Sequence, residues 1–458
     1  MSKNNLVVLS PQQEAELDRA FDCAQRLVDW TEIDRLHPRR ANAVFTNSVV
    51  LLLLLYQRVR KEKTLDAAVN FLLDSLPHML PDNKRVVENR LSNNTGGYAT
   101  ARKRLPLEAA KSVTQKISQT LIDATKPSLL NRRVYFFDGT TMTLAPVPAL
   151  QKLYPPASNQ HGEGVFPVAL LVMAFELRTG AAVLPEIGAM YGPNAVSETA
   201  LVGDLFQKIP RDCVVMGDAG FGIYWVAHQA QQTGHDSVMR LTASRYKSMV
   251  RNAQLVQQKG DWKTYSLKWR PSSKDRRSHP GLSKDSALDV RLHEIRIHEK
   301  LTLYLVTSLS ESALELSELY RHRNDAEIDI GNFKVVLDAE TMRVKSDDMF
   351  KKELWMSLAS YNVVNDFRRQ AAEQANVPPR RLSFTRVLRT FTTFLLAKQF
   401  QSAAEWRNAY ETALYYAMKV KLPNRPGRSY EREAYHKRSK SSGFKKRLPK
   451  STLPVSQK

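Results

Sequence analysis

The spacing of apolar residues predicts helices over the first and last parts of the chain. In residues 64–76, leucine and valine recur on one stripe of a helix, and residues 48–61 form a second apolar segment. Ser10, Pro11 and Gln13 have the order of a helix start, with a capping serine and a proline at the first helical position. We therefore expect residues 1 to about 127 to be helical. Further helices are expected over residues 347–375, 384–396 and 402–418.

From about residue 133 the apolar residues occur in short runs that are typical of strands. Five apolar segments are expected to be strands: 134–137, 165–177, 181–187, 213–216 and 238–241. One helix is expected over 195–209, and a second before the last strand. This alternation predicts an α/β unit. Residues 243–308 then keep a strand-like pattern, interrupted by a polar loop at 271–286, and are interpreted as a β insertion.

The net charge of the chain indicates what kind of partner it binds. The 458 residues carry a net charge of +22, and residues 419–458 alone contribute 13 Lys and Arg against 2 Glu. Such an excess favours a polyanionic partner, and we expect the tail to be a largely disordered basic arm. The basic loop residues Lys274, Arg276 and Arg277 could lie along a phosphate backbone or only keep the loop soluble.

The remaining composition indicates a soluble intracellular protein, and the family resemblance given below implies a bacterial cytoplasm and association with the nucleoid. The two cysteines, Cys23 and Cys213, are far apart and have no Cys or His at ligand spacing, which argues against a disulfide framework or a zinc site. The longest apolar run, 49–56, is too short to cross a bilayer, and we expect no membrane partner. The N-terminus lacks a charged and then apolar leader.

Two aspartates follow predicted core strands. Asp138-Gly139 comes directly after strand 134–137, and Asp218 comes after strand 213–216 in the sequence Gly217-Asp218-Ala219-Gly220. Ligands of open α/β sheets gather at the carboxyl ends of strands, so both aspartates are candidate functional residues. The alternative is that each only makes a turn.

The segment 320–334 has a polar face at helical spacing. At about 100° per residue, Tyr320, Arg323, Glu327 and Lys334 lie on one side, whereas Asp325 and Asp329 lie on the other. The alternative is a solvated helix with an ordinary i,i+4 ion pair.

An Asp, Asp, Glu set suits a site for hard cations. Magnesium is bound by a few carboxylates while open positions remain for water and phosphate, and two such ions can serve both oxygens of a phosphodiester exchange. Asp138, Asp218 and Glu327 are the candidate ligands. Arg323 and Lys334 would clamp phosphates beside the metals. Tyr320 would hydrogen-bond a phosphate or stack on a base.

A second candidate DNA contact lies in residues 92–106. This glycine-broken loop carries Tyr98, Arg102 and Arg104, with Lys103 between the two arginines. An aromatic residue beside clustered basic side chains suits contacts with phosphates and nucleobases. A charged surface turn is the alternative.

The spacing Tyr320-x2-Arg323-x3-Glu327-x6-Lys334 resembles the signature of the insertion-sequence-four family of DDE transposases. The stretches YFFDGTT and VVMGDAGFG are similar to the first and second acidic motifs of that family, and GGYATARKRLP, LWMSLASYNVV and LPNRPGRSYER occur in the same order. The resemblance implies a ribonuclease-H-like catalytic core, with Asp138, Asp218 and Glu327 holding two metals. It further implies that Tyr320, Arg323 and Lys334 grip DNA near the cleaved end.

The same resemblance implies a division of the chain into regions. Residues 1–127 would bind the transposon end, 128–242 with 309–345 would form the catalytic core, and 243–308 would be the β insertion. Residues 346–418 would pair two subunits, followed by the basic tail at 419–458. The expected fold class is therefore α/β, with a ribonuclease-H-like core interrupted by a β-rich insertion and flanked by N- and C-terminal helical regions.

One departure from the family concerns an aromatic residue. Well-known relatives carry a tryptophan shortly before a Thr-Ser-Leu, where it receives a flipped base during hairpin formation. Here Leu303 and Tyr304 precede Thr307-Ser308-Leu309. Tyr304 could stack on the base instead, or Trp262 or Trp269 could do so from a neighbouring strand, whereas core packing is the alternative for all three.

These observations predict a transposase that cuts and pastes its own element. It would use two Mg²⁺ ions, with Mn²⁺ able to substitute, and would act on the double-stranded inverted ends and on target DNA as a homodimer. A stand-alone metal-dependent nuclease and a catalytically inactive DNA-binding relative remain the alternatives. The intact acidic triad argues against the inactive relative.

Overall fold

The computed structural model describes residues 27–40, 42–60, 64–75, 80–88, 90–127, 131–159, 162–299, 301–396 and 403–423. Residues Met1–Lys421 form one compact unit; of the second, Leu422–Lys458, only residues 422 and 423 are described. The expected helix start at Ser10 and most of the basic tail lie outside the described residues. The predicted domain boundaries remain predictions.

The N-terminal part is helical, as its apolar pattern predicted. It contains α3 (Trp30–Leu36), α4 (Asn47–Val59), α5 (Leu65–Ser75), α6 (Lys84–Val87), α7 (Gly96–Arg104) and α8 (Leu107–Asp123). Every residue of α4 is buried, so the apolar run 49–56 is the core of this region. Within the described ranges, helices that combine the length and the apolar character needed to cross a bilayer are absent.

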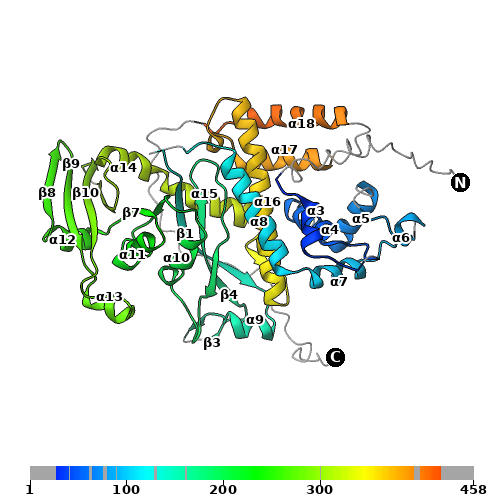
Figure 1. Cartoon of the computed structure of the whole chain (residues 1–458), viewed down its shortest axis with the longest axis horizontal. Coiled ribbons are helices and arrows are strands. Elements are labelled where there is room, and N and C mark those ends of the chain that lie inside the picture. The colour runs from blue at the N-terminus through cyan, green and yellow to red at the C-terminus, as the bar shows by residue number, and fades with distance from the viewer. Residues whose placement is uncertain are drawn as a thin grey trace, which may run out of the picture. The chain divides into compact units, whose positions relative to one another are not determined.

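A ten-stranded mixed sheet has the strand order β5-β4-β1-β6-β7-β11-β10-β9-β8, and β12 also pairs with β1. Figure 1 shows β1 and β4 near the middle of the ribbon and β8, β9 and β10 at one end. The strands are β1 (Val134–Leu144), β4 (Val168–Glu176), β5 (Glu186–Ala189), β6 (Val214–Gly217), β7 (Asp236–Arg240), β8 (Gln254–Lys259), β9 (Trp262–Trp269), β10 (Leu288–His298), β11 (Leu301–Thr307) and β12 (Thr341–Met342). The short strands β2 (Ser158–Asn159) and β3 (Gly162–Glu163) form a separate ribbon.

Strand β1 divides this sheet into two parts. It runs antiparallel to β4 on one side and parallel to β6 on the other. Strand β6 is parallel to β7, and β7 is antiparallel to β11. The strands of the expected β insertion therefore continue the central sheet through the β7–β11 pairing.

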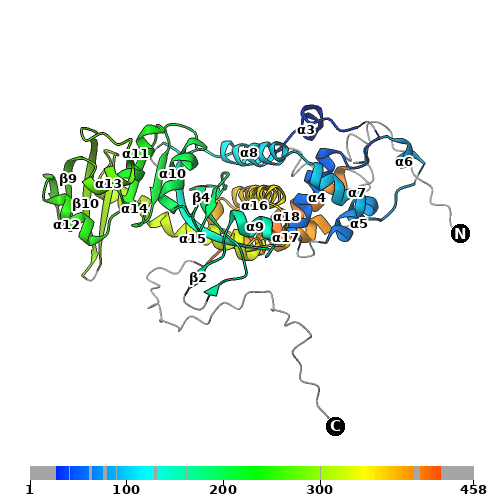
Figure 2. The same ribbon diagram turned by 90° about the horizontal axis from the view of Figure 1, so that it is seen from below.

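Alternate residues of β1 serve two hydrophobic layers, as the period of a strand requires. Val134 and Phe136 belong to the layer that contains α8 and α16 (Asp347–Gln374). Tyr135 and Phe137 belong to the layer that contains α10 (Glu198–Gln207) and α11 (Tyr224–Gln232). Helices α8 and α16 run alongside each other (Figure 2), so helices cover both faces of the sheet around β1.

Three local predictions were wrong. The segment 181–187 is not a full strand: Ala182 makes one bridge to Phe175, and β5 begins only at Glu186. The polar segment 271–286 contains a short helix, α13 (Ser273–Ser278), because Ser272 and Asp275 form a reciprocal capping box. The start of the segment 243–308 is not strand-like but forms helix α12 (Ala243–Val250), which begins after the capping residue Thr242. Another connection contains α9 (Pro148–Leu153).

A continuous helical run follows the sheet. It consists of α14 (Ala313–Tyr320), a 3₁₀ turn (Arg321–Arg323), α15 (Asn324–Gly331) and a π-helical turn (Asn332–Val336). The predicted helix over 320–334 is thus confirmed, but it is not regular, because the winding changes on both sides of α15. The chain ends in α16, a 3₁₀ turn (Pro379–Arg381), α17 (Phe384–Leu396) and α18 (Ala403–Met418).

Candidate active site

Asp138 lies within β1, not beyond its end as predicted. The strand continues to Leu144 because β4 pairs with it antiparallel, with Met173 opposite Asp138. The parallel pairing with β6 stops at Phe136, so Asp138 stands two residues past the last β1–β6 pair. Asp218 directly follows Gly217, the last residue of β6, as predicted. Both aspartates therefore belong to the same end of the β1–β6 pair.

Arg323 joins both aspartates to Glu327. Its Nη2 donates to Oδ2 of Asp138 at 2.8 Å and lies 3.5 Å from Oδ2 of Asp218. Its Nη1 donates to Oε1 of Glu327 at 2.6 Å, one helical turn further along. Helix α15 packs against β1 (Figure 1), which brings residues more than 180 positions apart into one cluster. The structure thus gathers the three carboxylates that the sequence had singled out.

The site is half enclosed and crowded with negative charge. The side chains of Asp138, Asp218 and Glu327 are 18%, 38% and 50% exposed. Burial raises the pKa of Asp138 above its usual value, and the neighbouring Asp218 and Glu327 add to this effect, whereas Arg323 opposes it. Burial alone would lower the pKa of Arg323, but the surrounding carboxylates hold it above its usual value.

Lys334 is fixed to the strand that carries Asp138. Its Nζ donates to the carbonyl oxygen of Thr141 at 2.8 Å and to Oγ1 of Thr140 at 3.2 Å, and it lies 3.8 Å from Glu340. The two Thr140 and Thr141 contacts place a second cation two to three residues along β1 from Asp138. The side chain is 15% exposed, so this ammonium group borders the acidic cluster from within the fold.

Tyr320 lies inside the fold and is not on the surface. The residue is 8% exposed, and its hydroxyl is directed at the carbonyl oxygen of Gly217, 3.5 Å away and next to Asp218. Burial raises the pKa of Tyr320 to about 12. In this position Tyr320 packs α14 against the end of β6, and its phenol is not available to stack on a base.

The acids on the other side of α15 have a different environment, which the helical spacing predicted. Asp329 is fully buried, receives a hydrogen bond from Arg380 at 2.7 Å and receives another from the hydroxyl of Tyr361 at 2.9 Å. Asp325 lies 3.8 Å from Arg380 and 3.3 Å from His322. These contacts attach α15 to the segment around Arg380. We interpret Asp325 and Asp329 as structural.

A fourth carboxylate, Glu198, was missed by the sequence analysis. It is the first residue of α10, after the capping Ser197, and its carboxylate lies so close to Gly139 that a Cβ there would be 1.9 Å from Oε1. Burial raises the pKa of Glu198, with contributions from Asp138 and Asp218. No local pattern marks this residue, because only the packing of α10 on β4 and β5 brings it to the site.

The donor set suits a hard cation, although the carboxylates are not arranged around one. Among the side chains that the structure describes, groups of three or more acidic, His or Cys residues close enough to hold a metal ion are absent. Arg323 lies between the carboxylates instead, and its guanidinium is the positive charge that they share. Carboxylate oxygens around a shared cation, with further exposed oxygens on Asp218 and Glu327, are the chemistry that Mg²⁺ and Mn²⁺ prefer.

The predicted DNA contacts in residues 92–106 divide into buried and exposed positions. Tyr98 is fully buried, and its hydroxyl donates to Gln57 at 2.8 Å. Arg102 is 13% exposed and, together with Arg58, binds Glu353 of α16. Both therefore hold α7 in the fold, and their positions do not support direct contact with DNA. Arg104 is exposed and lines a cavity described below.

The three candidates for base stacking lie apart. Tyr304 of β11 stacks on Tyr246, with ring centroids 4.3 Å apart. Trp269 packs edge-on against Tyr224, and Trp262, at the other end of β9, packs against the hydrophobic core. Trp262 and Tyr304 are partly exposed, as is Trp269. Each already has a packing partner in this structure, so a role in base stacking stays a prediction.

Comparisons with known proteins identify the family of this chain. Residues 130–363 match the model of the family described as Transposase DDE domain. The chain is 23% identical over 372 residues to the transposase InsG for insertion sequence element IS4 of Escherichia coli strain K12, which covers 79% of each protein. It also resembles a piggyBac transposase in a synaptic complex with hairpin DNA, with 11% identity, a TM-score of 0.37, and 91% and 87% of the two chains covered. The chain belongs to the DDE transposase family, with similarity to its IS4 type.

Proposed function

We propose that this protein cuts the inverted ends of an insertion sequence and joins them to target DNA, with Asp138, Asp218 and Glu327 as the metal-binding triad. The observation that carries the proposal is the position of Arg323. One guanidinium reaches carboxylates from β1, from the end of β6 and from α15, so the three acids already share a single positive charge. Structural acids, such as Asp329, are instead fully buried and paired with their own partners.

The topology of the sheet supports a ribonuclease-H-like core. A long strand, β1, has antiparallel neighbours on one side and parallel neighbours on the other, and helices cover both faces. The first acid lies on this central strand and the second at the end of its parallel neighbour. The third lies on a helix that packs on the central strand. In this proposal residues 243–308 are the insertion into that core.

The triad would hold one or two Mg²⁺ ions, for which Mn²⁺ would substitute. When bound, these ions would lower the pKa of water and stabilise negative charge on phosphate oxygens. Arg323 would have to leave the centre of the carboxylates, because its guanidinium lies where a shared cation would be. Glu198 would add negative charge beside Asp138 and thereby favour cation binding without being one of the triad.

The chain's own cations would position the DNA. Once released from the carboxylates, Arg323 offers a planar pair of donors for a phosphate next to the reacting one. Lys334 stays anchored to Thr140 and Thr141 and adds positive charge at the edge of the site. Tyr320, which is buried, would keep α14 and the end of β6 in register. We assign it this positioning role in place of the predicted DNA contact.

The proposed reaction consists of phosphoryl transfers at one acidic site. The oxygen of a water molecule attacks the phosphorus at the element boundary, the bond to the 3′-oxygen breaks, and a 3′-hydroxyl is released. That 3′-hydroxyl then attacks a phosphorus of another strand, loses its proton and displaces a second 3′-oxygen. Because each step exchanges one phosphorus–oxygen bond for another, the same carboxylates can serve both.

The partners of this reaction would be double-stranded DNA and a second copy of the chain. The net charge of +22 favours binding to a polyanion. We propose that two copies pair through the C-terminal helices, residues 346–418, when two ends are bound, and that the reaction takes place in the bacterial cytoplasm. The size of the free protein in solution and of the complex with end DNA would test the pairing.

The experiment is cleavage of DNA that carries the sequences flanking the coding region, followed by a search for joined products. With Mg²⁺, the unmodified protein should cut at the element boundary and give strand-transfer products. Glu327→Ala and Asp218→Ala should bind the same DNA without cutting it. Cleavage without joined products would indicate a metal-dependent nuclease. Binding without cleavage by the unmodified protein, with either Mg²⁺ or Mn²⁺ and with paired ends present, would indicate an inactive DNA-binding relative.

A further inference from the structure

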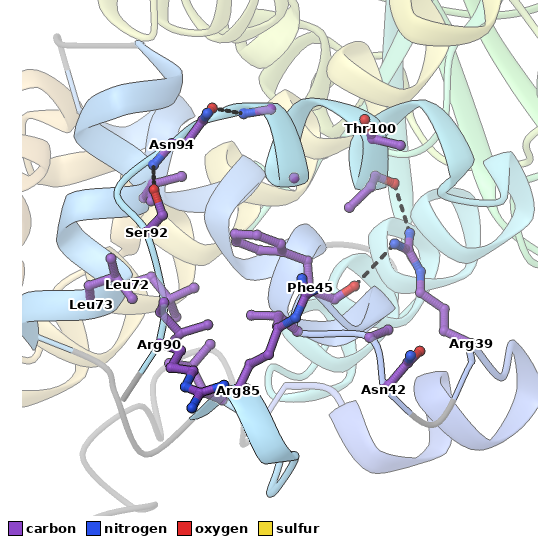
Figure 3. Close-up of a pocket in the computed structure, with 18 of the residues that line it drawn as sticks. Arg39, Asn42, Phe45, Leu72, Leu73, Arg85, Arg90, Ser92, Asn94 and Thr100 are labelled. Atoms are coloured by element: carbon purple, nitrogen blue, oxygen red, sulfur yellow. Dashed lines mark hydrogen bonds between the residues drawn. The ribbon is translucent and has the colours of Figure 1, made fainter. Parts of the chain in front are cut away.

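A basic cavity lies among the N-terminal helices, within the part of the chain before β1. It has a volume of about 600 Å³ and is lined by the loop before α4, by α5 and α6, and by the segment from Arg90 to Arg104 (Figure 3). Among the described lining residues there is no acidic one, and four are arginines: Arg39, Arg85, Arg90 and Arg104. A cavity of this size is typical of pockets that hold a small molecule or one unit of a polymer.

The positive charge of the cavity is only partly offset, because Asp34 acts on Arg39 and Glu88 pairs with Arg90. Arg39 donates hydrogen bonds to Oδ1 of Asn47 at 2.6 Å, to the carbonyl oxygen of Ala101 at 2.8 Å and to that of Phe45 at 3.0 Å. All three acceptors are neutral, so they fix the guanidinium and leave its charge available. Burial lowers the pKa of Arg39, the nearby Asp34 opposes this effect, and Arg104 adds to it to a smaller extent.

The other two arginines stand at a different part of the wall. Figure 3 shows Arg85 and Arg90 on one side of the cavity and Arg39 on the other, with Phe45 between them in this view. Arg90 lies 3.2 Å from Glu88, whereas the described residues include no ion-pair partner for Arg85. Arg85 is exposed. A flat basic surface would be sufficient for the phosphates of a duplex, so the apolar residues that also line this cavity need another explanation.

The floor of the cavity is apolar and includes an aromatic ring. Phe45 is partly exposed and packs against Gly97 and Tyr98. Aliphatic side chains complete the floor: Val44, Val69, Leu72, Leu73, Leu80 and Leu91. A ring supported from behind, with aliphatic neighbours and arginines at the rim, can stack on a base and bind the adjoining phosphate. A phosphate alone would gain nothing from the apolar floor.

We infer that this cavity binds one unpaired nucleotide of DNA, with its base against Phe45 and its phosphate between the arginines. The inference rests on the proposed function, since it requires that the protein act on DNA. Strand cleavage produces ends whose terminal bases are easily unpaired, and an unpaired base costs less to remove from the stack than a paired one. The cavity would thus retain a frayed end nucleotide. Arg58 and Arg102, which both bind Glu353, connect the helices around it to α16.

The test compares two DNA duplexes of the same sequence, one fully paired and one with a single unpaired thymidine. Both carry a fluorescent label and are titrated with the full chain at fixed salt in EDTA, so that cleavage does not interfere. The unmodified protein should bind the bulged duplex more tightly by roughly 5- to 150-fold, the range that one base stacked on an aromatic ring contributes. Equal affinities would overturn the inference.

Variants then locate the preference in the cavity. Phe45→Leu keeps an apolar side chain but removes the ring, and Thr100→Trp fills the cavity from an exposed position of α7. Both should lose the preference for the bulge while they bind the paired duplex as the unmodified protein does. A preference that persists in both variants would overturn the inference. Circular dichroism of each variant checks that the helices remain folded.

Charge variants separate a nucleotide pocket from a general phosphate surface. Arg85→Gln should weaken binding of the bulged duplex more than that of the paired duplex. Arg35→Gln removes an arginine that is 74% exposed and outside the cavity, and should weaken both equally. If Arg85→Gln weakens the binding of both duplexes equally, and Thr100→Trp does not change the affinity for either duplex, the cavity binds phosphate only. If the paired duplex is not bound at all, the proposed function fails together with this inference. If the paired duplex is bound and the bulged duplex is not bound more tightly, this inference alone is refuted.

Discussion

The guanidinium of Arg323 donates to the carboxylate of Asp138 across 2.8 Å and thereby connects α15 to the middle of the central sheet. The same group reaches Glu327 at 2.6 Å and lies 3.5 Å from Asp218. It is 13% exposed, so water screens these contacts only in part. Arg323 thus offsets the repulsion among the acids that we propose as metal ligands.

Replacement of this arginine should expose that repulsion. Arg323→Ala is expected to lower the free energy of unfolding without metal by about 1–3 kcal/mol, the range for lost hydrogen bonds to charged groups. Addition of Mn²⁺ should then raise its melting temperature more than that of the unmodified protein, because no guanidinium competes for the carboxylates. Thermal unfolding with and without Mn²⁺ measures both effects.

Arg321 provides the matched control for this experiment. It is 72% exposed and pairs with Glu318 one turn earlier on the helix, so Arg321→Ala should change stability by less than about 0.5 kcal/mol. An Arg323→Ala protein that is as stable as the Arg321→Ala protein, with the same response to Mn²⁺, would show that Arg323 does not restrain the carboxylates.

Two acids of α15 should respond in opposite ways. Asp329 is buried against Arg380 and Tyr361, so Asp329→Ala removes the nearest partner of a buried cation, which keeps only Asp325 at 3.8 Å, and should cost about 3–5 kcal/mol of stability. Glu327 is 50% exposed, and Glu327→Ala should abolish DNA cleavage with little loss of stability. Chemical denaturation of both variants, together with a cleavage assay of Glu327→Ala, distinguishes the structural acid from the proposed catalytic one. Equal losses of stability would contradict the assignment.

This division of α15 could be predicted from the sequence, because the helical period alone sets Glu327 and Arg323 apart from Asp329. The position of Asp138 could not. Its strand was expected to end at residue 137, but antiparallel pairing with β4, which is a long-range contact, extends β1 to Leu144.

The positions of residues that only tertiary packing brings together also could not be predicted from the sequence. The Gly-Gly turn before Tyr98 looked like a surface loop, whereas α7 turns this residue inward to Gln57. Glu198 follows a capping serine and has no pattern of its own, since it reaches Asp138 through the way α10 packs on the sheet. Functional residues on one helix were therefore easier to predict than those collected from several elements.

Glu198 should affect metal binding and not the fold. We expect Glu198→Gln to raise the Mg²⁺ concentration needed for half-maximal cleavage by about 10-fold, the lower end of what groups outside the ligand set contribute. Asp204→Asn removes an acid from an exposed position of the same helix and is the control. Cleavage measured across a Mg²⁺ titration gives the midpoint for each protein. Identical midpoints would exclude a role for Glu198.

A buried histidine of β10 should make the fold sensitive to acid. Burial lowers the pKa of His293 to about 4, with a contribution from Arg291, while the unfolded chain has a value near 6.5. Between these values the unfolded chain binds a proton that the folded chain does not, so stability falls as the pH falls from 6.5 to 4. At roughly 1.4 kcal/mol per pKa unit, the loss is at most about 3.5 kcal/mol.

His293→Asn removes this titration and should flatten the dependence of the unfolding free energy on pH over that window. His298→Asn alters an exposed position at the end of the same strand and should leave the slope unchanged. Denaturant titrations between pH 4 and 7 compare the three proteins. A slope that His293→Asn does not alter would mean that other groups cause the acid sensitivity.

The central claim is that Asp218, together with Asp138 and Glu327, binds the divalent cation used in strand cleavage. The most direct test replaces Asp218 with cysteine, because a thiolate is a softer ligand than a carboxylate and accepts Mn²⁺ more readily than Mg²⁺. We predict that Asp218→Cys cuts end DNA with Mn²⁺ but not with Mg²⁺, whereas Asp218→Ala cuts with neither. Normal Mg²⁺-dependent cleavage by Asp218→Ala would contradict the account.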